Sequence, residues 1–179
     1  MARTYINELS NHKGETVSVS GWIDVRRDQG KLIFLDIRDT SGIIQSVVLP
    51  NSAGMEAAKE LRPEWVVEIE GKVNERPEKN RNPEVVNGDI ELEVLSIKIL
   101  NEAETPAFDI TGDGKEIGEE NRLAFRYIDL RRPRLQKNIL MRHKVAKLIR
   151  DFLDKENFKE IETPYLTKST PEGARDYIV

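Results

Sequence analysis

An alternation of apolar and polar side chains at every second position constrains the first hundred residues of this 179-residue chain more than any other feature. A period of two is expected where one face of a strand is buried. It recurs in four segments, whose apolar positions are Val17, Val19, Ile23 and Val25; Ile33, Leu35 and Ile37; Val67, Ile69 and Val73; and Ile90, Leu92 and Val94. A further strand is predicted over 43–49, although its two faces are too alike to assign. The sequence therefore predicts five short strands.

The order of these strands predicts a particular small barrel. A short helix is expected over 53–61, between the third and fourth strands. Five strands with a helix in that place are the order of an OB-fold, an all-β Greek-key barrel that binds oligonucleotides on its face and loops. Leu95 follows Val94 directly and breaks the alternation, which indicates a β-bulge in the fifth strand.

The chain beyond residue 100 has a different character. Residues 101–120 contain Pro106 and seven acidic residues against the single base Lys115, and this composition predicts a hinge or linker. Apolar residues at helical spacing from Leu135 to Phe158 predict one long amphipathic helix. The segment 158–162 is a strand candidate that Pro164 would end. The predicted organisation is an OB-fold over 1–100, a hinge over 101–120 and a second domain that begins within 121–179.

Charge and composition limit the chemistry of the chain. The formal net charge is −4, but residues 122–150 contain ten basic residues and one acid, Asp129. Such a block attracts a polyanion, and a solvated helix face explains it equally well. Because the chain has no cysteine and only two histidines, His12 and His143, no metal site is expected. We expect a cytoplasmic protein with no membrane contact, since the sequence shows neither a membrane-spanning apolar run nor a signal peptide.

Several side chains of the predicted barrel suit single-stranded nucleic acid. Phe34 falls on the outward face of the second strand, where an aromatic ring can stack on a base. Arginines can contact phosphates, and amides or carboxylates can bond to the Watson-Crick edges of unstacked bases. These further candidates are Arg26, Arg27, Arg76, Gln45, Asn80, Asn82 and Glu91. Each alone also fits a solvated or packing role, but their occurrence together on four strands and one loop favours binding.

Four runs of the sequence resemble the bacterial-type aspartyl-tRNA synthetase family, a group of class II aminoacyl-tRNA synthetases. The runs are Gly21–Ile23 with Arg26–Asp28 and Leu32–Asp39; Arg126–Pro133; Phe158–Pro164; and Thr167–Tyr177. They resemble, in order, the anticodon-binding OB domain, the entry into the catalytic domain, class II motif 1 and the mobile loop that closes over the amino acid. The resemblance implies an aspartate-tRNA ligase in which the start of an α+β catalytic domain follows the hinge.

The resemblance also implies roles for individual residues. Phe34 is similar to the residue that stacks on the central anticodon base, and Gln45 to the residue that hydrogen-bonds the same base. The set that reads the first anticodon base and holds the loop would be Arg27, Arg76, Asn80, Asn82 and Glu91. Glu172 resembles the loop carboxylate that helps recognise the ammonium group of aspartate. Pro164 would lie at a homodimer interface built by motif 1.

The family forms an adenylate with ATP and Mg²⁺, using arginines of motifs 2 and 3. Because the sequence ends at Val179 before either motif, we expect no catalytic residue and no bound cofactor in these 179 residues. The expected partner is tRNA(Asp), and tRNA(Asn) stays open as a second one. Two other functions also stay open: a stand-alone OB-fold that binds single-stranded nucleic acid, and an oligomerisation or regulatory segment.

Overall fold

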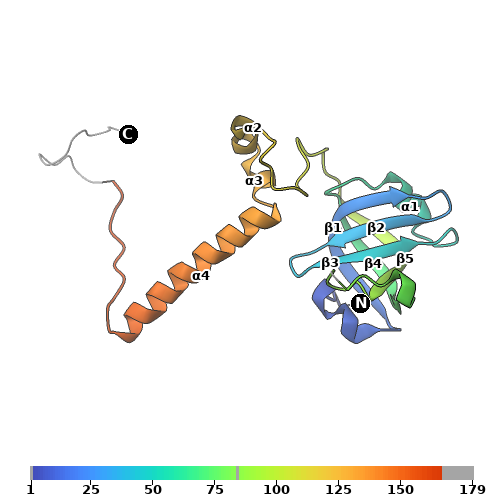
Figure 1. Ribbon diagram of the computed structural model, residues 1–179, viewed down its shortest axis with the longest axis horizontal. Coiled ribbons are helices and arrows are strands. Elements are labelled where there is room, and N and C mark those ends of the chain that lie inside the picture. The colour runs from blue at the N-terminus through green and yellow to red at the C-terminus, as the bar shows by residue number, and fades with distance from the viewer. Residues whose placement is uncertain (1, 84, 167–179) are drawn as a thin grey trace, which may run out of the picture. The chain divides into compact units, whose positions relative to one another are not determined.

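The computed structural model describes residues 2–83 and 85–166, and the chain divides into two compact units between Asp109 and Ile110. The first unit is a closed five-stranded barrel with the strand order β1-β2-β3-β5-β4 (Figure 1). Its strands are β1 (Thr16–Asp28), β2 (Ile33–Arg38), β3 (Ile43–Val48), β4 (Val66–Glu75) and β5 (Ile90–Asn101). All neighbouring strands are antiparallel except β3 and β5, which are parallel. The short helix α1 (Met55–Glu60) lies between β3 and β4, so the predicted OB-fold is confirmed.

The barrel interior is filled by the apolar positions that alternate along the strands. Ile33, Leu35 and Ile37 of β2 are at most 1% exposed, as the period of two predicts. On β3 the inward residues Ile44 and Val48 are buried, and the outward Val47 is buried as well. This two-sided burial explains why the sequence pattern could not assign the faces of the third strand.

Two bulges change which side chains face outward. On β5, Val94 pairs with Gly71 and Ser96 pairs with Glu70, so Leu95 is the extra residue and the predicted bulge is confirmed. A second bulge lies on β1, where the pairing with β2 shifts between Ile23 and Val25. The sequence placed Val25 inward, and this was wrong because the shift turns Val25 outward, opposite Asp36.

A short 3-10 helix, η1 (Ile6–His12), adds to the barrel core and was not predicted. Its Ile6 and Leu9 are fully buried within the core cluster. The Asp39 carboxylate holds this helix, because Oδ2 accepts a hydrogen bond of 3.0 Å from the Ile6 N–H. Its Oδ1 accepts bonds from the Ser41 N–H at 2.7 Å, the Ser41 hydroxyl at 2.6 Å and the Gly42 N–H at 3.0 Å. Asp39 therefore joins the N-terminal segment to the turn between β2 and β3.

The Asp39 contacts predict a component of stability that depends on pH. Burial raises the pKa of Asp39, but the hydrogen bonds from Ser41, Ile6 and Gly42 outweigh it and lower the pKa overall. A lowered pKa stabilises the fold above the carboxyl's unfolded pKa, near pH 4, and this stabilisation is lost as the pH falls through the folded-state value. We expect Asp39→Asn to cost about 1 to 3 kcal/mol at pH 7, because an amide NH₂ cannot accept from Ile6. Urea unfolding should show that the difference in free energy of unfolding between wild type and Asp39→Asn becomes smaller below pH 4. A difference that does not change with pH would contradict this account.

Gly71 makes the close approach of β4 and β5 possible beside the β5 bulge. A Cβ at this position would lie 2.7 Å from Leu92 Cγ and 2.8 Å from the Glu93 carbonyl oxygen. We expect Gly71→Ala to destabilise the barrel by about 1 to 3 kcal/mol through overpacking. Gly42→Ala is the matched control, since its Cβ would meet only Ile6 Cγ2 at 3.4 Å. Equal melting temperatures for the two variants would show that the strands separate without cost.

The second unit is built around a buried ion pair. Its helices are α2 (Glu119–Ala124), α3 (Arg126–Asp129) and α4 (Pro133–Lys155). Asp129 and Arg132 are both fully buried, and Arg132 Nε donates to Asp129 Oδ1 at 2.9 Å. Arg132 Nη1 donates to the Gly112 carbonyl at 3.0 Å. The second half of the stretch expected as a hinge therefore packs onto the second unit.

The long helix is confirmed as α4, but the strand expected after it is wrong. Over 158–164 the chain forms no ladder, because strands need a backbone partner and the described part of this unit contains no other strand. Most of the apolar stripe of α4 is exposed, including Ile139, Leu148 and Phe152. Pro164 is exposed in irregular chain, and Glu172 lies outside the described residues.

Candidate nucleic-acid interface

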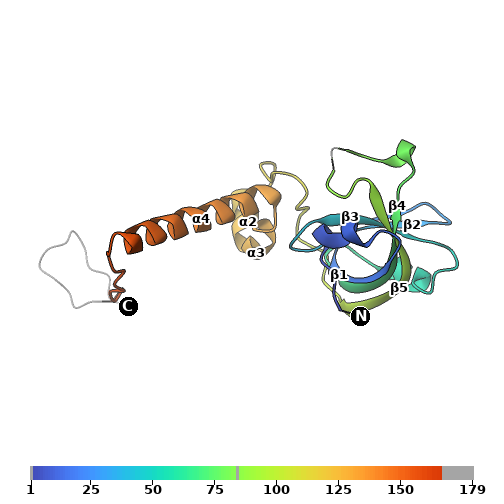
Figure 2. The same ribbon diagram turned by 90° about the horizontal axis from the view of Figure 1, so that it is seen from below.

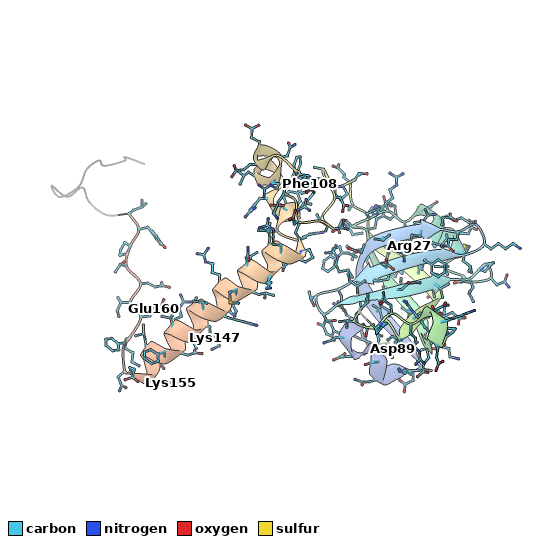
Figure 3. The ribbon with its side chains drawn as sticks, viewed as in Figure 1. Arg27, Asp89, Phe108, Lys147, Lys155 and Glu160 are labelled. Atoms are coloured by element: carbon cyan, nitrogen blue, oxygen red, sulfur yellow. The ribbon has the colours of Figure 1, made fainter. Side chains whose placement is uncertain are left out.

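The pairing register gathers three of the candidate residues on one outward face of the barrel. Leu35 points into the core, so its neighbour Phe34 points outward. Phe34 pairs with Arg27 on β1 and with Val47 on β3, and paired residues point to the same side of a sheet. Gln45 pairs with Asp36, the next outward residue of β2. Figure 3 shows Arg27 on this part of the barrel.

The same face continues across β5 and β4. Val47 pairs with Glu93, and Glu91 pairs with Asn74 on β4. Because Leu92 is buried between Glu91 and Glu93, both carboxylates point outward. The structure therefore brings Arg27, Phe34, Gln45 and Glu91 together on one face, here called the outward face, which also contains Asp36, Asn74 and Glu93.

The side chains on β1, β2 and β3 present three different binding groups. Phe34 is half-buried, which leaves part of its ring accessible. Arg27 Nη2 donates to Asp36 Oδ1 at 2.9 Å, so the guanidinium has a fixed place beside the ring position. The Gln45 amide forms no hydrogen bond within the described part of the chain. This arrangement offers one stacking surface, one oriented cation and one amide with both donor and acceptor capacity.

Arg76 and Glu91 form a loose charge pair at the edge of the outward face. Arg76 Nε lies 3.9 Å from Glu91 Oε2, which is too long for a hydrogen bond. The Arg76 side chain is only 12% exposed, and its Nε has no hydrogen-bond partner among the described residues. A buried guanidinium N–H without a partner costs free energy. The pair is therefore incompletely satisfied, and the more exposed Glu91 carboxylate retains acceptor capacity for a ligand.

Asn80 and Asn82 lie apart from the strands, on the connection between β4 and β5 that projects from the barrel (Figure 2). Asn80 ends the short 3-10 helix η2 (Glu78–Asn80), and both asparagines are exposed. Lys13 fixes the base of this connection, because its Nζ lies 3.0 Å from Asp89 Oδ2 and 3.1 Å from Glu75 Oε1. The hydrogen bond from Lys13 lowers the pKa of Asp89, which favours the charged pair.

One expected candidate has a structural role, and three contributors to the face were missed. Arg26 Nε donates to the Ala58 carbonyl at 2.8 Å, so this guanidinium holds α1 against the barrel. Asp36, Asn74 and Glu93 resemble ordinary solvated strand residues in the sequence, and only their cross-strand partners show that they belong to the outward face. Within the described residues, no group of three or more His, Asp or Glu side chains could hold a metal ion, and no helix is long and apolar enough to cross a membrane.

Two family models match the chain, one over each unit. Residues 17–100 match the OB-fold nucleic acid binding domain, and residues 118–179 match the class II tRNA synthetases for D, K and N. The first match covers every strand of the barrel, including the outward face. The first unit is therefore similar to an OB-fold nucleic-acid-binding domain, and the second to the class II tRNA synthetases for D, K and N.

Relatives narrow the group within this class. The aspartate–tRNA(Asp/Asn) ligase of Halothermothrix orenii is 50% identical over 98% of this chain and 30% of its own length. The aspartate–tRNA ligase of Geobacillus kaustophilus is 49% identical over 93% of this chain and 28% of its own length. Both relatives are named as aspartate-tRNA ligases, and the chain spans about 30% of their length.

Solved structures agree with the fold. Asparaginyl-tRNA synthetase from Pyrococcus horikoshii, complexed with asparaginyl-adenylate, is 27% identical, with a TM-score of 0.79 over 97% of this chain and 39% of its own. Aspartyl-tRNA synthetase from Entamoeba histolytica is 22% identical, with a TM-score of 0.81 over 94% of this chain and 41% of its own, and this similarity concerns the fold alone.

Proposed function

We propose that the barrel binds the anticodon loop of tRNA(Asp), as part of a ligase that joins aspartate to tRNA at the expense of ATP. The observation that supports this most directly is the outward face, where a half-buried aromatic ring, an amide with no partner among the described residues and a loose charge pair lie on adjacent strands. Unstacked bases require a ring to stack on and polar groups for their Watson-Crick edges. Relatives named as aspartate–tRNA ligases support the choice of tRNA.

Each side chain of the face has a proposed part. Phe34 stacks on the central anticodon base and Gln45 hydrogen-bonds the same base. Glu91 accepts from the first anticodon base and draws Arg76 into a complete pair when the base is bound. Arg27, Asn80 and Asn82 hold the loop from the strand and from the β4–β5 connection. Because the Halothermothrix orenii relative is named for both tRNA(Asp) and tRNA(Asn), tRNA(Asn) is included as a second partner.

The rest of the chain is assigned by the same proposal. Residues 1–100 form the anticodon-binding domain, 101–120 the hinge and 121–179 the start of the catalytic domain. Glu172 contributes to aspartate recognition and Pro164 to a homodimer interface. ATP and Mg²⁺ act in the complete enzyme, which works in the cytoplasm, and motif 2 and motif 3 arginines supply its catalysis.

Replacing Phe34 by alanine tests the proposal. We expect Phe34→Ala to weaken binding of an aspartate anticodon stem-loop by about 1 to 3 kcal/mol, because stacking on the central base is lost. The melting temperature should change little, since the core is formed by the odd positions of β2. Fluorescence anisotropy at one fixed salt concentration measures the affinity.

Two control variants separate stacking from general effects. Leu100→Ala removes a comparable exposed side chain from β5 away from the outward face, and should leave affinity unchanged. Leu35→Ala should lower the melting temperature through a core cavity. If Phe34→Ala destabilises the barrel as much as Leu35→Ala and leaves affinity intact, the proposed face is wrong. A wild-type chain that binds an unrelated pyrimidine-rich loop equally well would instead favour a non-specific nucleic-acid binder.

A further inference from the structure

We infer that Glu93, held in place by Asn74, reads a second base of the bound RNA, one that carries an exocyclic amino group. The inference rests on the proposed function, since it extends the same outward face toward β4. Glu93 lies in one cross-strand row with Phe34 and Val47. Two strand spacings, about 10 Å, separate the backbones of Phe34 and Glu93, a distance that a neighbouring nucleotide spans.

The carboxylate of Glu93 is oriented by Asn74, but only one of its two oxygens accepts a hydrogen bond within the described residues. Asn74 Nδ2 donates to Glu93 Oε2 at 2.8 Å, and both side chains are partly buried. The other oxygen, Oε1, accepts no hydrogen bond from any described residue. A carboxylate is purely an acceptor, so Oε1 needs a donor. Asn74 has no charge and therefore orients the carboxylate without neutralising it.

Charge on the outward face makes Glu93 different from its acidic neighbours. Asp36 is neutralised by Arg27 at 2.9 Å, and Glu91 lies 3.9 Å from Arg76. Lys72 pairs with Glu93 in register but forms no ion pair with it in the described structure. An unneutralised anion on a surface that binds a polyanion opposes binding unless a ligand donor compensates it.

The chemistry of the free oxygen selects the base. Cytosine, adenine and guanine each present an exocyclic amino group that donates to a carboxylate, whereas uracil presents carbonyl oxygens beside its single N–H. Approach of a uracil carbonyl to Oε1 is repulsive. Glu93 therefore favours an amino-bearing base next to the nucleotide stacked on Phe34, and Asn74 is its positioning residue.

The test uses stem-loops in which one loop base at a time loses its amino group. Cytosine is replaced by 2-pyrimidinone, adenine by purine and guanine by hypoxanthine (inosine), and dissociation constants are measured for the 179-residue chain at one salt concentration. For wild type, we expect one such change, outside the central anticodon base, to weaken binding about tenfold. The amino-group ratio is the dissociation constant for the loop without the amino group divided by that for the unmodified loop. In Glu93→Gln this ratio should fall to about threefold or less, because a charged acceptor becomes neutral.

Two further variants keep the result interpretable. Asn74→Ala leaves the charge of Glu93 but removes its orientation, and should reduce the same ratio at the same base. Glu70→Gln removes a carboxylate from an exposed position of β4 elsewhere on the barrel, and should keep the wild-type ratio. Circular dichroism checks that each variant is folded. If Glu93→Gln does not fold, the ratio measured with Asn74→Ala decides the question.

The outcomes separate this inference from the proposed function. If the wild-type chain binds no anticodon stem-loop, the proposed function fails and the inference fails with it. If binding depends on Phe34 but the amino-group ratio is unchanged in Glu93→Gln and Asn74→Ala, only the inference is overturned. A uniform gain in affinity for every loop, equal in Glu93→Gln and Glu70→Gln, would also overturn it, since Glu93 would then act only as a repelling charge.

Discussion

The register shift between Ile23 and Val25 decides what the barrel presents to a ligand. The part of β1 before the shift pairs with β4, and the part after the shift pairs only with β2. One long strand therefore contributes to the pairing of two neighbouring strands. Without the shift, Arg27 would pair with the inward residue Ile33 and share the inward parity of Ile23. With the shift, Arg26 takes the position opposite the buried Leu35, and its guanidinium donates to the Ala58 carbonyl. The bulge also places Arg27 beside Phe34.

Closure of the barrel fixes the remainder of the face. Since the side-chain period of a strand is two, a slip of one residue would move Phe34 into the core and Leu35 out of it. β2 is paired on both sides, with β1 and β3, and therefore has no free edge along which to slip. Asp39 adds a tie at the end of β2 by bonding both the turn and η1. The groups on the strands are consequently preorganised, whereas Asn80 and Asn82 depend on a connection held mainly by exposed ion pairs, which are individually weak.

Sequence alone predicted what depends on local periodicity and missed what depends on pairing. The inward residues of β2, β4 and β5 and the bulge at Leu95 followed from alternation. The sequence did not indicate the β1 bulge, because the polar Asp24 after Ile23 fits the alternation whether or not the strand is bulged. η1 was missed because Ile6 is held by Asp39, a residue 33 positions away. Glu93 and Asn74 resembled solvated strand residues until the pairing of β5 with β3 and β4 was known.

The same distinction applies to the basic residues between 122 and 150. A count along the sequence treats every positive charge as available to a polyanion. In the structure, Arg132 is fully buried on Asp129, and Arg126 Nη1 donates to the other Asp129 oxygen at 2.8 Å. Arg134 bonds to the Asp113 carbonyl, and Lys147 lies 2.8 Å from Asp151.

Removing either partner of the buried Asp129–Arg132 pair would leave an uncompensated charge in the interior, so these groups are required by the fold of the second unit. Of these four bases only Arg132 is committed to the interior, whereas Arg126, Arg134 and Lys147 remain exposed beside their partners. In the first unit the balance differs, because the groups offered to a ligand are mostly uncharged or already paired. Base recognition there depends on where a ring, an amide and an oriented carboxylate are placed, and the strand register sets those places.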